Sequence, residues 1–494
     1  MILNNNKITA QQKLFLIIGS FTLLRIIVSI FVEPGFDEAY YGMYSYHLSA
    51  GYFDHPPLVA VSAGLGRFLT GVSNSLTLRI GAIVIFVFTS LSVYKLAEKI
   101  FNKKTGIISV ILLNIIPYFC VGLGAFVIPD NFLGLFWVGS LLVLYQIRKT
   151  DKSKYFYFLG VMGGLALLSK YHAVLLIFAI FLSFLIDDKF RKWMKTPYPY
   201  VSFIIAILIF IPNLLWNYQH NWVSYIYQFG KSASGFDFSF LKFFRGIMVQ
   251  MGYLLPWHMG ILVAGTIWVW KKGKEYSWLL PQIIVPILIF TIIGGTRQIL
   301  PHWPMPGYLV AIIASAAMIG EWKDKISKRY LFSTGIFTII LVLFVTIQAE
   351  FGIISLNQKS DVTLDGQGWK KLAQHLEQKN YINKNRFLFT HKWFLSGELA
   401  FAVKNRYPVT VINDSPHAFY YWVDDITITG KDGIYIGTNR YKTEVNEKYS
   451  IYFKQITAID TLKTARYGNK AKTFYIWLCE DYNGQFKYPY GNKR

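Results

Sequence analysis

The chain has 494 residues, of which 53% are apolar and 18% aromatic, and its mean hydropathy is +0.35. This profile is far from that of an average soluble domain and predicts a lipid-exposed protein. A formal net charge of +23 is typical of nucleic-acid-binding proteins, but the basic residues do not gather in one patch with interleaved aromatic residues. They lie in short loops between apolar runs, so we expect no nucleic-acid partner.

The N-terminus and the cysteines exclude two other classes. Lys7 and Lys13 precede an apolar run of roughly twenty residues, which is longer than a signal-peptide core and lacks a small-residue cleavage pattern. We interpret this run as a retained first helix. The two cysteines, Cys120 and Cys479, are far apart and lack metal-ligand spacing, so neither a disulfide framework nor a zinc site is indicated.

Eleven apolar runs are candidates for helices that cross a hydrocarbon core of about 30 Å. Eight of them are long: 13–32, 79–97, 106–123, 200–216, 245–270, 278–294, 304–320 and 331–349. Three are shorter, 132–147, 156–169 and 172–186, and a split or tilted helix stays open there. The sequence therefore predicts an all-α polytopic membrane protein with about 11 transmembrane helices, within a range of 11–13.

The loop charges predict the orientation, because cytoplasmic loops retain an excess of Lys and Arg. If the N-terminus is inside, the inner loops contain twenty such residues and the short outer loops contain five, namely Arg67, Lys170, Lys231, Lys242 and Arg297. The odd helix count then places residues 350–494 outside. We therefore expect a multi-pass protein of the plasma membrane, with its chemistry on the outer face.

Residues 350–494 differ in character from residues 1–349. Polar helical stretches such as 367–379 alternate there with strand-like segments at 386–390, 408–412, 432–437 and 473–478. We predict two domains: a transmembrane domain over 1–349 with a long first outer loop at 33–78, and a small extracytoplasmic α/β domain over 350–494.

The first outer loop carries two adjacent carboxylates directly after the first helix. Asp37 and Glu38 lie at the membrane surface, where ionised groups are costly unless they are paired or used. Asp37 also precedes a helical stretch whose N-terminus favours an anion. The alternative, which stays open, is that Asp37 only caps this helix and Glu38 is a solvated charge.

The same loop is rich in tyrosine and contains a proline turn. Asp54-His55-Pro56-Pro57 ends the helical stretch, because the residue before a proline is disfavoured in a helix. The aromatic residues favour a helix in the membrane interface, where such rings anchor more often than they bind sugar. They are Tyr40, Tyr41, Tyr44, Tyr46, Tyr52 and Phe53.

Further charged residues recur at the same outer level. Asp130 lies in the next outer loop and could converge with Asp37 on one cavity, or simply cap the following helix. Lys170 and Arg297, with His302, lie in other outer loops. A lipid phosphate at headgroup depth is a natural partner for these scarce outer cations, although lone Lys and Arg side chains often only extend to the headgroups.

Four motifs in order resemble glycosyltransferase family 39 of the GT-C superfamily, which includes protein O-mannosyltransferases and lipid A aminoarabinose transferases. They are Phe36-Asp37-Glu38-Ala39-Tyr40-Tyr41, Tyr52-Phe53-Asp54-His55-Pro56-Pro57-Leu58, Ile128-Pro129-Asp130 and Gly164-Leu165-Ala166-Leu167-Leu168-Ser169-Lys170-Tyr171. The resemblance extends over most of the membrane part and more loosely into the tail. It implies a GT-C fold in a bacterial inner membrane.

The resemblance also implies the reaction and its residues. It implies inverting transfer of a sugar from an undecaprenyl- or other polyprenyl-phosphate donor to lipid A, another glycan or a protein. Asp37 matches the family's catalytic aspartate, Asp130 matches a second acidic position, and Glu38 is a further catalytic candidate. The candidate substrate- and phosphate-binding residues are Tyr40, Tyr41, His55, Lys170, Arg297 and His302. We expect no resident metal, with a weak link to a divalent cation left open.

One position departs from the resemblance, and two other classes stay open. His55 stands where aminoarabinose transferases carry a lysine before the paired prolines, and a neutral imidazole supplies no permanent charge. This weakens a transfer of that subfamily's donor or acceptor, but not the reaction class. A flippase or transporter would place ionisable residues near the membrane midplane. A surface-glycan polymerase or ligase is harder to distinguish.

Overall fold

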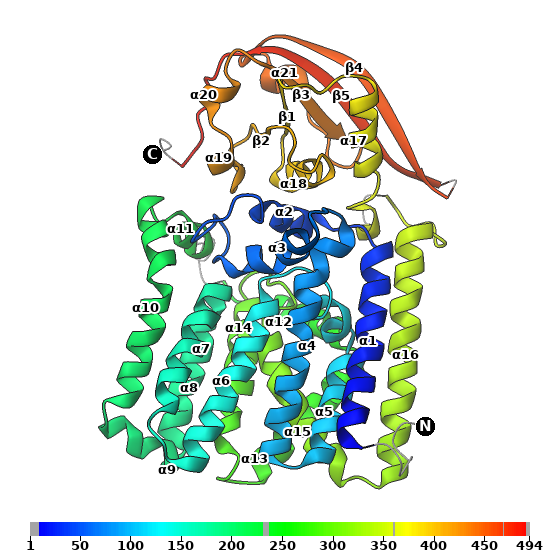
Figure 1. Cartoon of the computed structure of the whole chain (residues 1–494). Helices are drawn as coiled ribbons and strands as arrows, with labels where there is room; N and C mark the ends of the chain where they lie inside the picture. The colour runs from blue at the N-terminus through cyan, green and yellow to red at the C-terminus, as the bar shows by residue number, and fades with distance from the viewer. Residues whose placement is uncertain (1–8, 231–236, 359–360, 468, 491–494) are drawn as a thin grey trace.

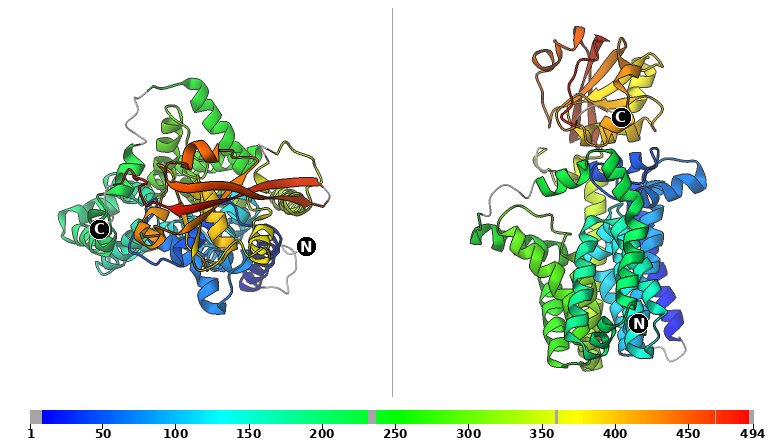
Figure 2. Two further views of the ribbon diagram at one scale, coloured as in Figure 1. Left: turned by 90° about the horizontal axis from the view of Figure 1, so that it is seen from above. Right: turned by 90° about the vertical axis from the view of Figure 1, so that its left-hand side faces the viewer.

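The computed structural model describes residues 9–230, 237–358, 361–467 and 469–490. It consists of a bundle of long helices with a smaller domain over one end, which we call the cap domain (Figure 1). α1 (Ala10–Phe31) begins at the opposite end of the bundle, and the side view of Figure 2 gives the same arrangement. The cap domain is formed by residues after α16 (Asp324–Phe351).

The bundle is formed by helices that follow the apolar runs. They are α1 Ala10–Phe31, α4 Ser75–Ile100, α5 Lys103–Ile115, α6 Asp130–Thr150, α7 Tyr155–Ser169, α8 Val174–Ile186, α10 Tyr198–Gln219, α12 Phe240–Leu254, α13 Pro256–Lys271, α14 Leu280–Gly294, α15 Met305–Glu321 and α16. Shorter helices are α2 Phe36–Tyr44, α3 Leu58–Thr70, α9 Asp188–Arg191, α11 Val223–Gly230 and the single turns η1 Tyr118–Leu123, η2 Tyr171–Ala173, η3 Lys192–Lys195 and η4 Ser277–Leu279.

Length and apolar composition confirm the architecture but not the exact helix count. In the described part of the chain, six helices are long and apolar enough to cross a membrane, or seven if the bent pair α12 and α13 forms one span. Four apolar helices are shorter: Leu58–Thr70, Tyr155–Ser169, Tyr171–Ile186 and Met305–Glu321. The number eleven stays a prediction.

Two predicted spans are interrupted. The run 106–123 is divided between α5, which ends at Ile115, and η1, because Ile116 is extended before Pro117. The run 245–270 is divided more sharply. Residues 245–270 were expected to form a continuous helix, but the chain bends by 102° between α12 and α13. Leu255 adopts φ 69° and ψ 139° at the break, and Pro256 begins α13. Proline lacks an amide hydrogen and disfavours a helical conformation in the residue before it, so the break has a local cause.

Ion pairs show which loops share an end of the bundle. Loops predicted to be inner contact one another, as in the pairs Lys104–Asp324 at 3.0 Å and Lys272–Glu321 at 2.7 Å. Predicted outer loops meet beneath the cap domain. Lys7 and Lys231, which contribute to the two loop counts, lie outside the described residues. Which end of the bundle faces the periplasm is predicted from the loop charges alone.

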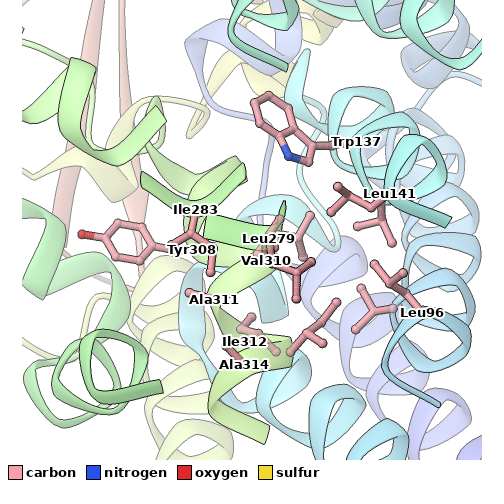
Figure 3. Close-up of a cluster of buried hydrophobic side chains, with 14 of the residues drawn as sticks. Leu96, Trp137, Leu141, Leu279, Ile283, Tyr308, Val310, Ala311, Ile312 and Ala314 are labelled. Atoms are coloured by element: carbon pink, nitrogen blue, oxygen red, sulfur yellow. The ribbon is translucent and has the colours of Figure 1, made fainter. Parts of the chain in front are cut away.

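The bundle core surrounds α15, nearly all of which is buried. Figure 3 shows Tyr308, Val310 and Ile312 of α15 among side chains of α4, α6 and α14. Close helix contact requires small residues: a Cβ atom at Gly265 of α13 would lie 2.5 Å from the Cα atom of Ser315. This packing fixes the helices whose outer ends carry the candidate site.

The cap domain contains a five-stranded sheet in the order β2-β1-β3-β5-β4. β1 pairs in parallel with β2 and β3, and β5 pairs antiparallel with β3 and β4. The strands are β1 Arg386–Thr390, β2 Val409–Val411, β3 Asp432–Thr438, β4 Phe453–Arg466 and β5 Asn469–Tyr482. The four predicted strand segments are confirmed. The sequence prediction missed β4, an edge strand whose side chains are mostly exposed and lack a clear apolar alternation.

Helices cover the sheet and connect it to the bundle. They are α17 Trp369–Gln378, α18 Trp393–Ala402, α19 Phe419–Trp422, α20 Asp425–Ile428 and α21 Val445–Tyr449, preceded by the turn η5 Val362–Leu364. α18 lies directly on α2, at the junction of the two parts (Figure 1). The long first outer loop is therefore enclosed between the bundle and the cap domain.

Candidate active site

The site begins at α2, where Glu38 is fully engaged. Arg79 of α4 donates to its two carboxylate oxygens at 2.9 and 2.5 Å. The backbone N–H of Val127 donates to the same carboxylate at 3.0 Å. The side chains of Arg79 and Glu38 are 0% and 9% exposed, so this ion pair is buried. It holds α2 against α4 and the loop before α6.

Asp37, the preceding residue, is in the opposite situation. Its side chain is exposed, and no hydrogen bond or ion pair joins it to another described residue. Although the side chain keeps accessible surface, the protein around it displaces much of the bulk water, and this desolvation, with the nearby charges of Asp54 and Glu38, raises the pKa of Asp37 from 3.8 to about 6. Asp37 is thus a carboxylate open to ligands, with a pKa suited to accepting a proton near neutral pH.

Asp54 is the centre of a hydrogen-bond network on the cap-domain side of the site. Tyr40 and Tyr44 donate hydroxyl hydrogen bonds to it at 2.7 and 3.2 Å. His417 of the cap domain places Nδ1 3.0 Å from Asp54 Oδ1. Burial raises the pKa of Asp54, but the interactions with His417, His55 and Tyr40 together outweigh this effect, and the net shift is downward. The backbone N–H of Ala418 donates to the Tyr40 hydroxyl at 3.0 Å, so the cap domain contacts this network twice.

Tyr41 and His55 connect this network to the next cluster. The Tyr41 hydroxyl lies 2.9 Å from Nε2 of His55. Burial lowers the pKa of His55 to about 4, and its buried Nδ1 has no hydrogen-bond partner in the described residues. Burial also raises the pKa of Tyr41, and the charges of Asp37, Asp54 and Asp130 raise it further. Tyr41 therefore lies within electrostatic range of all three carboxylates.

The third cluster joins three outer loops. Asp130 begins α6, and Lys170 follows the last residue of α7. The Lys170 Nζ atom lies 2.9 and 2.8 Å from the two Asp130 oxygens, with both side chains buried. His302 Nε2 lies 3.9 Å from Asp130. Burial and the Lys170 charge lower the pKa of His302 to about 4. Arg297, half-buried, comes from the same loop as His302.

Most of the candidate residues thus meet in one region beneath the cap domain. Tyr40, Tyr41, Asp37, Glu38 and His55 belong to the first outer loop, and Asp130, Lys170 and His302 to the adjacent cluster. Sequence reasoning missed two groups, Arg79 and His417. His417 lies 363 positions from Asp54, and no local pattern predicts such a contact. Arg79 begins the apolar run 79–97, where a cation needs a partner; this signal indicates that a partner exists but not that it is Glu38.

The described residues include no group of three or more His, Cys, Asp or Glu side chains placed to hold a metal ion. A role for a divalent cation stays open.

A family model described as dolichyl-phosphate-mannose-protein mannosyltransferase matches residues 54–216, about a third of the chain. The matched segment includes His55, Asp130 and Lys170 and begins after Asp37.

Curated relatives are undecaprenyl phosphate-alpha-4-amino-4-deoxy-L-arabinose arabinosyl transferases. The protein of Yersinia pestis (strain Pestoides F) is 23% identical over 312 residues, covering 60% of this chain and 54% of the relative. That of Edwardsiella ictaluri is 23% identical over 300 residues, covering 57% and 52%. The chain spans about half the length of these relatives.

Solved structures of ArnT from Cupriavidus metallidurans share the fold at 12% identity. The apo structure gives a TM-score of 0.64 over 95% of this chain and 98% of the other. The structure bound to undecaprenyl phosphate gives 0.65 over 98% and 100%. The likeness therefore covers the cap domain as well as the bundle.

Proposed function

We propose that the chain is a GT-C glycosyltransferase related to protein O-mannosyltransferases and lipid A aminoarabinose transferases, and that it transfers a sugar from a polyprenyl-phosphate carrier to an envelope acceptor. The predicted location is the periplasmic face of a bacterial inner membrane. The curated relatives are undecaprenyl phosphate-linked sugar transferases, which favours undecaprenyl phosphate as the carrier. The resemblance to lipid A aminoarabinose transferases favours lipid A as the acceptor. The sugar, hexose or pentose, is left to experiment.

One observation carries this proposal: an unengaged carboxylate with a raised pKa, Asp37, lies at the same end of the bundle as the Lys170 cluster. The charges of both Asp37 and Asp130 contribute to the raised pKa of Tyr41, which supports a location of the two carboxylates near the same tyrosine. A base and a phosphate-binding cation are the two groups that such a transfer needs.

The chemistry assigns one role to Asp37. An acceptor oxygen attacks C1 of the sugar as its proton passes to the Asp37 carboxylate. The bond between C1 and the phosphate oxygen breaks, and its electron pair leaves with the polyprenyl phosphate. Attack opposite the leaving group inverts C1. Phosphate is a good leaving group, so no second carboxyl group is needed as a general acid, in contrast to glycoside hydrolysis.

The cation cluster is suited to the leaving phosphate. Lys170 is held by Asp130 in a fixed position, and a phosphate can share its ammonium hydrogens, because Lys has three donors. Arg297, His302 and His55 supply further donors at the same level. Their preorganisation stabilises charge that develops on the leaving group. Asp130 therefore positions Lys170, and Glu38, whose two oxygens are both engaged by Arg79, positions α2.

Analysis of envelope lipids and glycans by mass spectrometry tests the proposal in cells. A strain that lacks the protein should lose one glycosylated species and accumulate its carrier-linked sugar. The wild-type gene should restore that species, and Asp37→Asn should not. An unchanged glycan and lipid profile under conditions where the protein is expressed would contradict the proposal.

A further inference from the structure

A second recess lies beside the candidate active site. It has a volume of about 320 Å³ and lies between the segment after α2, the C-terminal end of α10 and α19 of the cap domain. Most of its wall consists of rings, contributed by His47, Tyr52, Trp216, His220, Tyr421 and Trp422. We call it the aromatic pocket. Its volume is at the lower end of the range of about 300–1,000 Å³ for small-molecule sites.

The rings of the aromatic pocket are fixed by one another. Trp216 stacks on His220 with centroids 4.0 Å apart and an interplanar angle of 14°. His47 stacks on Trp422 at 4.8 Å and 10°. Tyr421 meets the first pair edge-on, 5.0 Å from the His220 centroid. The first pair comes from the bundle with Tyr421 of the cap domain against it, and the second pair joins the first outer loop to the cap domain, so residues of both parts bound the same space.

The aromatic pocket is uncharged. Among the described residues that line it there is no Asp, Glu, Lys or Arg. Burial lowers the pKa of His47 to about 4, which leaves this imidazole neutral at pH 7. An anionic ligand would find no cation here, and a cationic one no carboxylate.

The two imidazoles offer complementary hydrogen-bonding atoms. His220 Nδ1 lies 2.7 Å from the carbonyl oxygen of Trp216, which only accepts, so Nδ1 carries the hydrogen and Nε2 of the neutral ring can accept. The amide nitrogen of Asn405 donates to His47 Nε2 at 3.5 Å, so Nδ1 of His47 carries a hydrogen that it can donate. Hydroxyl groups both donate and accept, and they match this pair. An acyl chain would leave both imidazoles unsatisfied.

The aromatic pocket adjoins the reaction centre through the chain itself. Phe53 and Ala418 line it, and their neighbours Asp54 and His417 form a hydrogen-bonded pair next to Tyr40. A ligand in the aromatic pocket would therefore contact Phe53 and Ala418, each of which is next in the chain to a residue of the Asp54 hydrogen-bond network.

We propose that the aromatic pocket binds an uncharged saccharide unit of the acceptor, which presents a further group to the reaction centre. The apolar C–H face of a pyranose packs on the electron-rich face of an indole, and its hydroxyl groups reach the imidazole edges. The assignment of this saccharide to the acceptor rests on the proposed function. The prediction that the aromatic pocket binds a saccharide does not.

Saturation-transfer NMR on the full chain in detergent tests the binding directly. The probes are the methyl β-glycosides of glucose, galactose and N-acetylglucosamine. We expect transfer to ring C–H protons of at least one glycoside in the wild type, and at least a tenfold loss of affinity in Trp422→Leu and in His220→Phe, which keeps a ring but removes the acceptor. Trp257→Leu, an exposed tryptophan of α13 outside the aromatic pocket, is the control and should bind normally.

Two NMR results would overturn the proposed pocket: no saturation transfer to any glycoside with the wild type, or undiminished saturation transfer with both Trp422→Leu and His220→Phe. Tighter binding of methyl β-glucosaminide, whose ammonium group an aromatic cage would favour, would overturn the uncharged assignment.

Transfer kinetics separate this inference from the proposed function. In Trp422→Leu the KM for the acceptor should rise about tenfold while that for the carrier-linked sugar is unchanged. An unchanged acceptor KM despite lost glycoside binding would overturn the acceptor assignment. Absence of any transfer by the wild type would contradict the proposed function, whereas the NMR result would still decide whether the aromatic pocket binds saccharides.

Discussion

Asp37 and Glu38 are chemically similar neighbours in entirely different environments. Arg79 and a backbone amide saturate Glu38, while Asp37 has no such partner in the described chain. A paired carboxylate is held in its ionised form and accepts protons poorly, whereas a partly desolvated one accepts them more readily. The two environments therefore support a positioning role for Glu38 and the proposed catalytic role for Asp37, although the sequence pattern presents both residues alike.

Asp37→Asn should reduce transfer to less than a tenth of the wild-type rate, because a positioned base contributes roughly 10²–10⁴-fold. The substitution is isosteric and removes a charge that its surroundings disfavour, so the thermal midpoint at pH 7 should not fall. Asp414→Asn, at an exposed carboxylate of the cap domain, is the matched control.

The pH dependence follows from the same group. Its pKa of about 6 means that the active, ionised form dominates above pH 6. The rate should rise about tenfold per pH unit below that value and level off above it. A flat profile between pH 5 and pH 7, or a variant that keeps a substantial rate, would show that Asp37 is not the base.

Removing one partner of the Arg79–Glu38 pair should destabilise the chain. The remaining charge would be buried without a partner, at a cost of about 3–5 kcal/mol. Thermal unfolding in detergent should therefore show a clearly lower midpoint for Glu38→Gln and for Arg79→Met. Glu98→Gln, which breaks an exposed pair with Lys95, should cost less than about 1 kcal/mol. Equal midpoints for all three variants would refute the structural role of Glu38.

Lys170→Gln and Arg297→Gln should raise the KM for the carrier-linked sugar more than they lower stability. Lys170→Gln leaves Asp130 unpaired, so the double variant with Asp130→Asn serves to restore folding without restoring donor use. Lys242→Gln, an exposed cation at the same end, is the control. Unchanged donor kinetics in both Lys170→Gln and Arg297→Gln would mean that these side chains serve only to contact headgroups.

At the scale of elements, the critical contact is α18 on α2. A Cβ atom at Gly397 of α18 would lie 3.0 Å from the Cβ atom of Tyr40, and one at Gly42 of α2 would lie 3.0 Å from the Phe401 ring. Phe36 packs on Phe394 with centroids 4.6 Å apart. Glycine on both helices brings them close enough for His417 and the Ala418 amide to reach the Asp54 network.

Gly397→Leu should separate these helices and lower turnover at least tenfold. The overpacking cost is about 1–3 kcal/mol and falls on the junction, so the bundle should still fold. The control is Gly19→Leu on α1, where no atom lies within 4 Å of the added Cβ. Activity assays and limited proteolysis of the cap domain provide the measurement. Wild-type turnover in Gly397→Leu would contradict a role of this contact in the site.

The elements differ in how far the sequence predicts them. Apolar runs predict the bundle helices well, because a span needs about twenty apolar residues whatever its neighbours. The break at Leu255 was missed although Pro256 signals it, since the run on both sides of it is predominantly apolar. β4 was missed because an exposed edge strand needs no apolar alternation. For the site, motif resemblance supplied Asp37, Asp130 and Lys170, whereas Arg79 and His417 follow only from long-range packing.

At the scale of the whole molecule, the cap domain completes a site that the bundle only begins. Asp37, the tyrosines and the Lys170 cluster lie at the end of the bundle next to the cap domain, and His417 of the cap domain contacts Asp54 there. The twenty-to-five distribution of basic residues predicts that this end faces the periplasm. A lipid carrier in the outer leaflet would then present its phosphate at the level of Lys170. Surface chemistry of this kind needs no transmembrane gradient.

The most direct test of this account is therefore a transfer assay with the purified chain in detergent, without sealed vesicles. Given an undecaprenyl-phosphate-linked sugar and an envelope acceptor, the wild-type chain should consume the donor and release undecaprenyl phosphate, while Asp37→Asn should not. The opposite outcome would contradict the account: no transfer from any carrier-linked sugar in detergent, together with movement of the lipid-linked sugar across reconstituted vesicles.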